Sequence, residues 1–216
     1  MSVRNKLLLV FVFGIVVLSA AEMVVAGSGS MTKPYSEGDS WSGFQSSAQH
    51  YPYYGRVEAS SQCWSPAGGD AWAWIGAIDT DIPYTRTFTM TASMKLYAYQ
   101  HGGSFFFLPC SHSYIGVYFE IRDADDPDTV LWTNSIIPFS SNVFMSNVFP
   151  FETDTFNPYT WTKTKTSDPI ISSYGNYLFC VKLYVYTRLG GLVCKYQGGP
   201  SVMARLYVTQ ISWSYD

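Results

Sequence analysis

The sequence predicts an all-β protein, a two-sheet antiparallel β-sandwich or jelly roll of about seven or eight strands. Three observations lead to this prediction. Apolar and polar residues alternate with a period of two over several long segments. No segment shows a convincing helical stripe with capping signals. The 216 residues also suffice for one domain with a sizeable core.

Four segments alternate most regularly. In the first of them, residues 88–98, the even positions are apolar and the odd positions hold Thr, Ser, Lys or Tyr. The last segment changes phase between Val208 and Ile211, as a β-bulge near Thr209-Gln210 would produce. The four segments are 88–98, 115–122, 177–186 and 202–215, and shorter candidates are 71–78, 130–137 and 159–166.

The first 26 residues predict a signal peptide. Two cations precede an apolar run over residues 7–18, and small residues follow it. We expect cleavage after Ala26, or after Ala21 as the alternative, to give a secreted or extracellular-surface chain. No later apolar run is long enough to span a membrane. An uncleaved anchor is the other interpretation of this segment.

The remaining chain is expected to have two parts. Residues 27–70 are predicted to be a loop-rich N-terminal extension, and residues 71–216 the β-sandwich domain. Two polar, aromatic stretches, 38–69 and 139–173, resist strand assignment. Long connections of this kind in compact domains are often functional.

Four cysteines follow the predicted signal, and none is spaced for a zinc site. In an exported protein, a dispersed and even set predicts two disulfides. The sequence leaves their connectivity open. We expect Cys110–Cys194, which would link the loops of two similar hairpins, and Cys63–Cys180 as the remaining pair.

The order of these features is similar to that of a known group of proteins. A signal is followed by a strand that alternates Thr and Ser, a Gly/Ser-rich hairpin, the strand–turn–strand "FEIRDADDPDTVLW" and a Tyr-rich hairpin that ends in "VTQISWSYD". Over residues 71–216 the chain resembles the uncharacterised secreted β-sandwich, jelly-roll-like proteins common in archaeal genomes. The resemblance implies the fold and assigns no catalytic residue.

The sequence offers no catalytic residue of its own either. It lacks a Gly-x-Ser-x-Gly elbow, a His-Glu-x-x-His motif and a phosphate-binding glycine loop. Glu120 lies two residues before Arg122 on the outward side of a predicted strand, which favours a surface ion pair over a catalytic carboxylate. The net charge is −3 without a basic block, which argues against nucleic acid as a partner.

One acidic cluster is a candidate calcium site. It consists of Asp123, Asp125, Asp126 and Asp128, and calcium takes carboxylate oxygens as ligands. The cluster lacks the glycine and the later glutamate of a helix–loop–helix calcium loop, and Asp and Pro are common turn residues. An ordinary hairpin turn is therefore favoured, and no other cofactor is expected.

Aromatic residues make up 18% of the chain and are its richest functional signal. Tryptophan and tyrosine offer a large flat surface with a polar tip, on which a sugar ring can stack. Those in strand patterns (Trp72, Trp74, Trp132 and Trp213) are expected in the core. The candidate ligand-binding residues lie in the two unassigned stretches and are Tyr51, Tyr53, Tyr54, Trp64, Tyr159 and Trp161. Structural packing is the alternative role for this second set.

Only 13% of the residues are charged, against a typical value of about 25%. Outward strand positions carry Thr, Ser and Tyr, which suits a contact surface, and only Lys163 and Lys165 resemble protection of a sheet edge. The sequence favours a non-catalytic extracellular or cell-surface module that binds carbohydrate or another cell-surface component. The alternatives are a self-assembling subunit of a surface layer or filament and, third, a secreted hydrolase.

Overall fold

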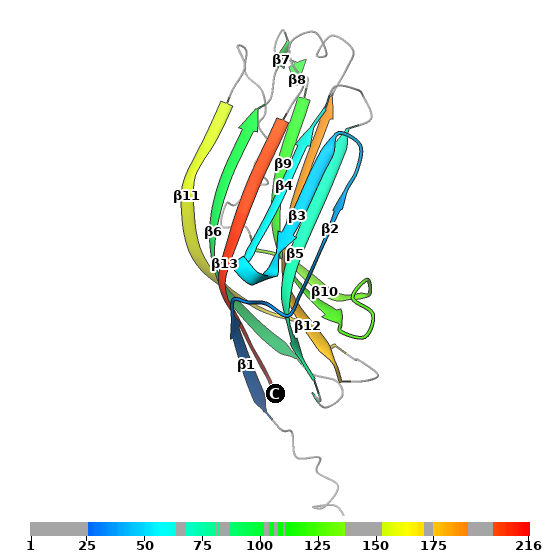
Figure 1. Cartoon of the computed structure of the whole chain (residues 1–216), viewed down its shortest axis with the longest axis vertical. Helices are drawn as coiled ribbons and strands as arrows, with labels where there is room; N and C mark the ends of the chain where they lie inside the picture. Colours follow the sequence, from blue (N-terminus) through cyan, green and yellow to red (C-terminus); the bar gives the residue numbers. More distant parts are fainter. Residues whose placement is uncertain are drawn as a thin grey trace, which may run out of the picture.

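The computed structural model describes residues 26–63, 68–80, 82, 87–101, 104–105, 108–109, 111–136, 153–170, 175–189 and 201–216. They form two antiparallel sheets packed face to face, as predicted, and the strands run along the long axis of the molecule (Figure 1). The elements are β1 (Gly27–Thr32), β2 (Glu37–Ser42), β3 (Ser46–Tyr51), η1 (Pro52–Tyr54), β4 (Arg56–Gln62), β5 (Gly69–Asp79), β6 (Phe88–His101), β7 (Ser104–Phe105), β8 (Leu108–Pro109), β9 (Ser111–Asp123), β10 (Val130–Ser135), β11 (Thr153–Thr166), β12 (Tyr177–Leu189) and β13 (Ser201–Tyr215).

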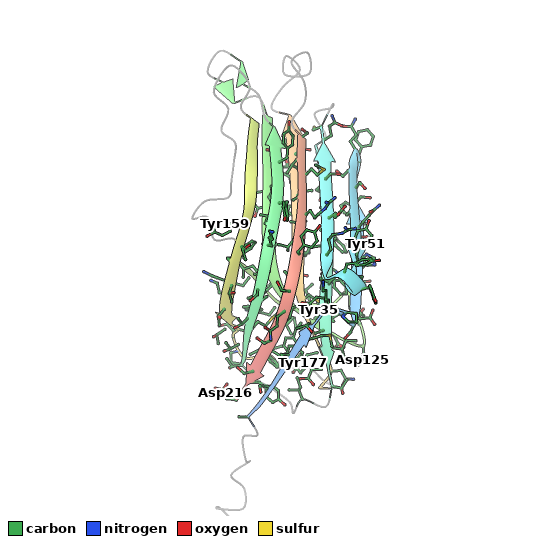
Figure 2. All side chains as sticks on the ribbon, turned by 60° about the vertical axis from the view of Figure 1, so that its left-hand side comes forward. Tyr35, Tyr51, Asp125, Tyr159, Tyr177 and Asp216 are labelled. Carbon is green, nitrogen blue, oxygen red and sulfur yellow. The ribbon has the colours of Figure 1, made fainter. Side chains whose placement is uncertain are left out.

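The six-stranded sheet has the order β11-β6-β13-β4-β3, and β1 pairs with the far end of β13. The five-stranded sheet has the order β10-β9-β12-β5-β2, and β7 and β8 form a small separate pair. Because β11 and β3 are opposite edges of the larger sheet, Tyr159 and Tyr51 lie on opposite sides of the molecule (Figure 2). The described residues thus place eleven strands in the two sheets, more than the seven or eight predicted.

Both the regular segments and the shorter strand candidates of the sequence correspond to strands, and the shorter ones, 71–78, 130–137 and 159–166, fall at β5, β10 and β11. β6, β9, β12 and β13 contain the four regular segments. The pairing of β13 with β6 shifts register between Val208 and Gln210, which confirms the predicted bulge. Beyond it the core-facing positions change from even to odd residues, so that Trp213 stays inside.

The N-terminal region is not loop-rich, and that prediction is wrong. Residues 27–62 supply β1 to β4, and β4 is an interior strand between β13 and β3. The inward positions of β4 are Val57, Ala59 and Ser61, which are small and carry little apolar signal. In β1 the glycines make room for aromatic rings, since a Cβ on Gly29 would lie 2.4 Å from the indole of Trp213.

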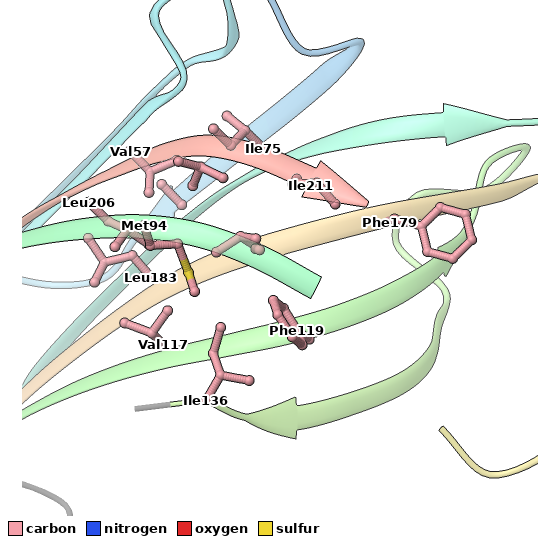
Figure 3. Close-up of a cluster of buried hydrophobic side chains, with 14 of the residues drawn as sticks. Val57, Ile75, Met94, Val117, Phe119, Ile136, Phe179, Leu183, Leu206 and Ile211 are labelled. Carbon is pink, nitrogen blue, oxygen red and sulfur yellow. The ribbon is translucent and has the colours of Figure 1, made fainter. Parts of the chain in front are cut away.

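The core fills the space between the sheets along the length of the sandwich (Figure 3). Met94 and Leu206 from one sheet face Val117 and Leu183 from the other, and all four are almost fully buried. The Trp213 ring stacks on Phe179 with centroids 4.6 Å apart and ring planes 10° apart. Dense packing of large side chains from both sheets is the main source of stability in such a sandwich.

The edge strand β11 contains the two lysines expected to protect an edge. Lys163 lies opposite Ala92 and Lys165 opposite Met90, so both start from the core-facing side of the strand and are partly exposed. Charges in this position hinder the pairing of another strand onto the edge, and the topology confirms the predicted edge position.

No helix within the described residues is long and apolar enough to cross a membrane. Residues 1–25 lie outside them, so the signal peptide stays a prediction.

The predicted Cys63–Cys180 disulfide is wrong, because these two buried cysteines are not joined to each other. Cys180 packs against Trp74 and Leu178 on the outer side of β12. Cys63 follows β4 at the end of the sandwich where Ser61 contacts Thr187, with the oxygens 2.7 Å apart. Thr187 is about 23 Å along the strand from Cys180, which is too far for a disulfide. Cys110 and Cys194 lie outside the described residues, and their pairing stays a prediction.

We expect Cys180 to resist a thiol-specific reagent in the folded protein at mildly alkaline pH. Burial removes the thiol from solvent and raises its pKa well above the usual value, so little thiolate forms. Unfolding in denaturant without a reductant should expose the thiol to labelling, which peptide mass spectrometry would locate. Rapid labelling of Cys180 in the folded protein would contradict this placement.

Candidate functional site

A shallow groove crosses the outer face of the six-stranded sheet. It has a volume of about 420 Å³ and is built on β3, β4, β13 and β6, which lie side by side (Figure 1). We call it the tyrosine groove. Its lining residues are Ser47, Ala48, Gln49, Glu58, Ala59, Ser60, Tyr97, Ala98, Tyr99, Met203, Ala204, Arg205 and Tyr207.

Strand register explains how distant parts of the sequence meet in this groove. Alternate residues of a strand point to the same face, and residues opposite each other on paired strands are direct neighbours. The first row across the sheet is Tyr51, Arg56, Tyr207 and Lys95, of which Tyr207 lines the groove and the others lie at its border. The second row is Gln49, Glu58, Arg205 and Tyr97, and the third is Ser47, Ser60, Met203 and Tyr99.

Two tyrosines form the aromatic part of the groove. The rings of Tyr97 and Tyr207 meet edge to face, with centroids 5.7 Å apart and planes at 73°. Tyr97 is 38% exposed, and the Nζ of Lys95 lies 5.0 Å from its ring centroid. Met203, which is 60% exposed, adds an apolar side chain on the neighbouring row. The groove therefore offers aromatic edges and a flexible thioether to a ligand.

Glu58 of the groove lining is the centre of a small network of charges, in which Arg205 lines the groove and Arg56 lies at its border. Oε1 of Glu58 lies 3.1 Å from Nε of Arg56 and 2.5 Å from Nε of Arg205. The guanidinium of Arg56 stacks on the ring of Tyr51 at 4.1 Å. These contacts hold planar polar groups side by side, and such groups can hydrogen bond to several hydroxyls of one ligand.

The rest of the same sheet face, toward β1, is a uniform array of hydroxyl groups. Three pairs link β6 to β11: Thr89 with Thr166, Thr91 with Thr164 and Ser93 with Thr162, with oxygens 3.1, 2.8 and 2.9 Å apart. We call this array, which also includes Ser28 and Ser30 of β1 and Ser212 and Ser214 of β13, the hydroxyl face.

The structure separates the aromatic residues that the sequence singled out. The ring of Tyr51 packs on the guanidinium of Arg56 at the border of the tyrosine groove. Tyr53 and Tyr54 are exposed on η1, the turn that joins β3 to β4. Tyr159 is exposed at the opposite edge of the sheet (Figure 2). Trp161 is only 8% exposed and belongs to the core cluster, so its expected role as an exposed platform is wrong. Trp64 lies outside the described residues.

The tryptophans expected in the core follow two patterns. Trp213 is in the core between the sheets. Trp74 is buried instead on the outer side of the five-stranded sheet, where Trp72 packs partly exposed beside it. Trp132 is partly buried against the main core.

The aspartate cluster makes the contacts of an ordinary turn between β9 and β10. Asp123 Oδ1 accepts a hydrogen bond from the Asp125 amide at 2.9 Å, and Asp126 Oδ2 accepts one from the Thr129 hydroxyl at 2.7 Å. Asp125 accepts a hydrogen bond from Asn176 at 3.1 Å, and Asp128 is exposed. Within the described part of the chain, no three His, Cys, Asp or Glu side chains are grouped to hold a metal ion.

Glu120 and Arg122 pair as predicted, but not at the surface, and each is only 4% exposed. Glu120 also accepts a hydrogen bond from Nζ of Lys182 at 2.9 Å. The guanidinium of Arg122 stacks 4.8 Å from the ring centroid of Trp74, which explains the burial. The pair thus has a structural role beneath a tryptophan.

Sequence reasoning missed Tyr97, Tyr99 and Tyr207, the tyrosines that line the groove. They occupy outward positions of β6 and β13, whose inward positions gave the strand signal. The signal that could have found them is the tyrosine itself, because an outward position of a strand is usually charged or small and polar.

No protein-family model and no curated protein matches the sequence. Among solved structures, the chain is similar to TmCBM61 in complex with β-1,4-galactotriose, with 7% identity over 81% of this chain and 88% of that chain and a TM-score of 0.27. It is also similar to the K1 cleaved adhesin domain of Lys-gingipain from Porphyromonas gingivalis (8% identity, 87% and 97% coverage, TM-score 0.26).

A third similar structure belongs to the carbohydrate-binding modules of the β-sandwich superfamily, with 12% identity, 85% and 56% coverage and a TM-score of 0.24. Carbohydrate-binding modules and an adhesin domain are thus among the structural neighbours. TM-scores at this level assign neither a fold nor a function to this chain.

Proposed function

We propose that the chain is a non-catalytic extracellular module that binds a carbohydrate in the tyrosine groove. The observation that carries this proposal is the combination of exposed and partly exposed tyrosine rings with planar charged and amide groups in one depression. Sugar rings present apolar C–H faces and many hydroxyls, so they need an aromatic surface beside groups that donate and accept hydrogen bonds.

The groove lining also favours binding over hydrolysis. Most glycosidases use two carboxylates about 5–10 Å apart across the scissile bond. The lining of the tyrosine groove contains one carboxylate, Glu58, and this group is bound to Arg56 and Arg205. A single carboxylate between two guanidiniums suits a fixed hydrogen-bond acceptor better than an acid or a nucleophile.

Replacement of Tyr97 by valine should weaken binding of a glycan selected on an array by about 1–2 kcal/mol, which is roughly tenfold in Kd. Valine keeps the β-propensity of the position while it removes the ring, so the melting temperature should change little. Titration calorimetry would measure the effect. Tyr184→Val is the matched control, because Tyr184 is a partly exposed tyrosine on the other sheet. Equal loss of affinity in both variants would contradict the proposed site.

A self-assembling subunit is the second candidate, and the hydroxyl face is the observation that favours it. The described side chains of this face are neutral, so two copies could approach face to face without charge repulsion. Hydroxyl groups both donate and accept hydrogen bonds, which makes such a surface complementary to itself. Analytical ultracentrifugation and electron microscopy of the purified protein would reveal oligomers or filaments. A monomer at high concentration would exclude this candidate.

A further inference from the structure

The cations on the outer face of the six-stranded sheet lie in the tyrosine groove or at its border. Arg205 lines the groove, whereas Arg56 and Lys95 lie at its border, on the row of Tyr207. Among the described side chains of that face, the charged ones are Arg56, Arg205, Lys95 and Glu58. Three cations thus face one carboxylate, although the whole chain carries a net charge of −3. The adjacent hydroxyl face adds no charge. The groove and its border together are therefore a local positive site on an acidic protein.

Two of these cations stand next to the tyrosines that would hold a sugar ring. Arg205 lies directly opposite Tyr97 on paired strands, and Lys95 lies directly opposite Tyr207. The side chain of Arg205 is 49% exposed, and its contact with Glu58 is through Nε, at the inner end of the guanidinium. Arg56 has a more structural position between Glu58 and the ring of Tyr51.

This placement suits a ligand that carries both a ring and an anionic group. A sugar that packs on Tyr97 and Tyr207 would present its substituents to the guanidinium of Arg205 and the ammonium of Lys95. A guanidinium matches the two oxygens of a carboxylate or sulfate better than it matches a single hydroxyl. Glu58 would repel an anion at close range, but the two arginines that it contacts offset its charge.

We infer that the tyrosine groove selects an acidic carbohydrate, whose carboxylate or sulfate group is held by Arg205 and Lys95. This inference rests on the proposed function, since it specifies the ligand of the same site. The positive groove would also attract such a ligand from a distance, so binding should weaken as salt is raised.

Two pairs of polysaccharides, each with a charged and a neutral member on the same backbone, would test the inference and separate the two anions. The first pair is polygalacturonate and its fully methyl-esterified form, which share a backbone, and the second is dextran sulfate and dextran. We expect the charged member of at least one pair to bind about tenfold or more tightly than its neutral partner at low salt. A preference for the charged member in the first pair alone would identify carboxylate as the preferred anion, and a preference in the second pair alone would identify sulfate.

Variants then locate the effect in the groove. Arg205→Gln and Lys95→Gln should each reduce affinity for the acidic polymer severalfold and lower its salt dependence. Arg188→Gln is the matched control, because Arg188 is exposed on β12 of the other sheet. An equal loss in the control would show that the attraction comes from the whole protein and would overturn the inference.

The test distinguishes failure of the inference from failure of the proposed function. Equal binding of the charged and neutral members, or binding of neutral glycans alone, would overturn the preference for anions and leave the carbohydrate site standing. Failure to bind either acidic polymer would also overturn that preference. Failure on a broad panel of neutral and acidic glycans would overturn the proposed function as well.

Discussion

Replacement of Glu120 by alanine is expected to destabilise the protein by about 3–5 kcal/mol, because it leaves a buried guanidinium without its carboxylate. Glu120 Oε2 accepts the Nε–H of Arg122 at 2.9 Å, and Glu120 Oε1 binds Lys182 at 2.9 Å. Lys182 is partly exposed and can turn toward water, but Arg122 is covered by Trp74. Most of the cost therefore falls on Arg122.

Two further variants test this explanation by chemical denaturation. Glu37→Ala removes an exposed carboxylate of β2 and should change the free energy of unfolding by less than about 0.5 kcal/mol. The double change Glu120→Leu with Arg122→Leu should recover much of the stability lost in Glu120→Ala, because buried pairs can often be replaced by apolar residues. If Glu120→Ala unfolds at the same denaturant concentration as the unchanged protein, the pair is not buried as described.

The regular strands could be predicted from the sequence because their buried faces contain large apolar residues. β12 is the clearest case, since Phe179, Val181 and Leu183 alternate on its inner side. β3 and β4 lack such a run, and their inner positions are filled by alanine, valine, serine and histidine. β4 is a strand because it pairs with β13 and β3 in its own sheet and packs against β5 and β12 of the five-stranded sheet. These are tertiary effects that local propensity does not contain.

The tyrosine groove could not be predicted because it depends on pairing between distant segments. Glu58 meets Arg205 only when β4 pairs with β13, and Arg205 meets Tyr97 only when β13 pairs with β6. The sequence shows Arg205 and Tyr97 on outward positions of predicted strands and places Glu58 in a stretch without a predicted strand. The order of strands in the sheet is not encoded locally. The same limit applies to the burial of the Glu120–Arg122 pair. Pairing of β5 with β12 brings the ring of Trp74 over Arg122, and this contact is not visible in the sequence.

Replacement of Trp161 by alanine is expected to lower the free energy of unfolding by about 3–5 kcal/mol and to leave glycan affinity unchanged. Trp161 lies opposite Met94, with its indole in the core cluster and its ring 5.6 Å from that of Tyr159. Its removal would leave a cavity beneath the edge strand β11. The tyrosine groove is on the outer face of the sheet, on β6, β13, β4 and β3, whereas Trp161 points from β11 into the core on the opposite face.

The variant Trp161→Phe separates loss of volume from loss of polar contact. The buried indole Nε1 has no hydrogen-bond partner among the described atoms, so phenylalanine would remove an unsatisfied donor while it keeps an aromatic ring in place. We therefore expect Trp161→Phe to retain most of the stability that alanine loses, as measured by urea denaturation. Binding should be measured below the unfolding transition. An alanine variant that keeps its stability but loses glycan affinity would restore Trp161 as a stacking platform and would move the site from the groove to β11.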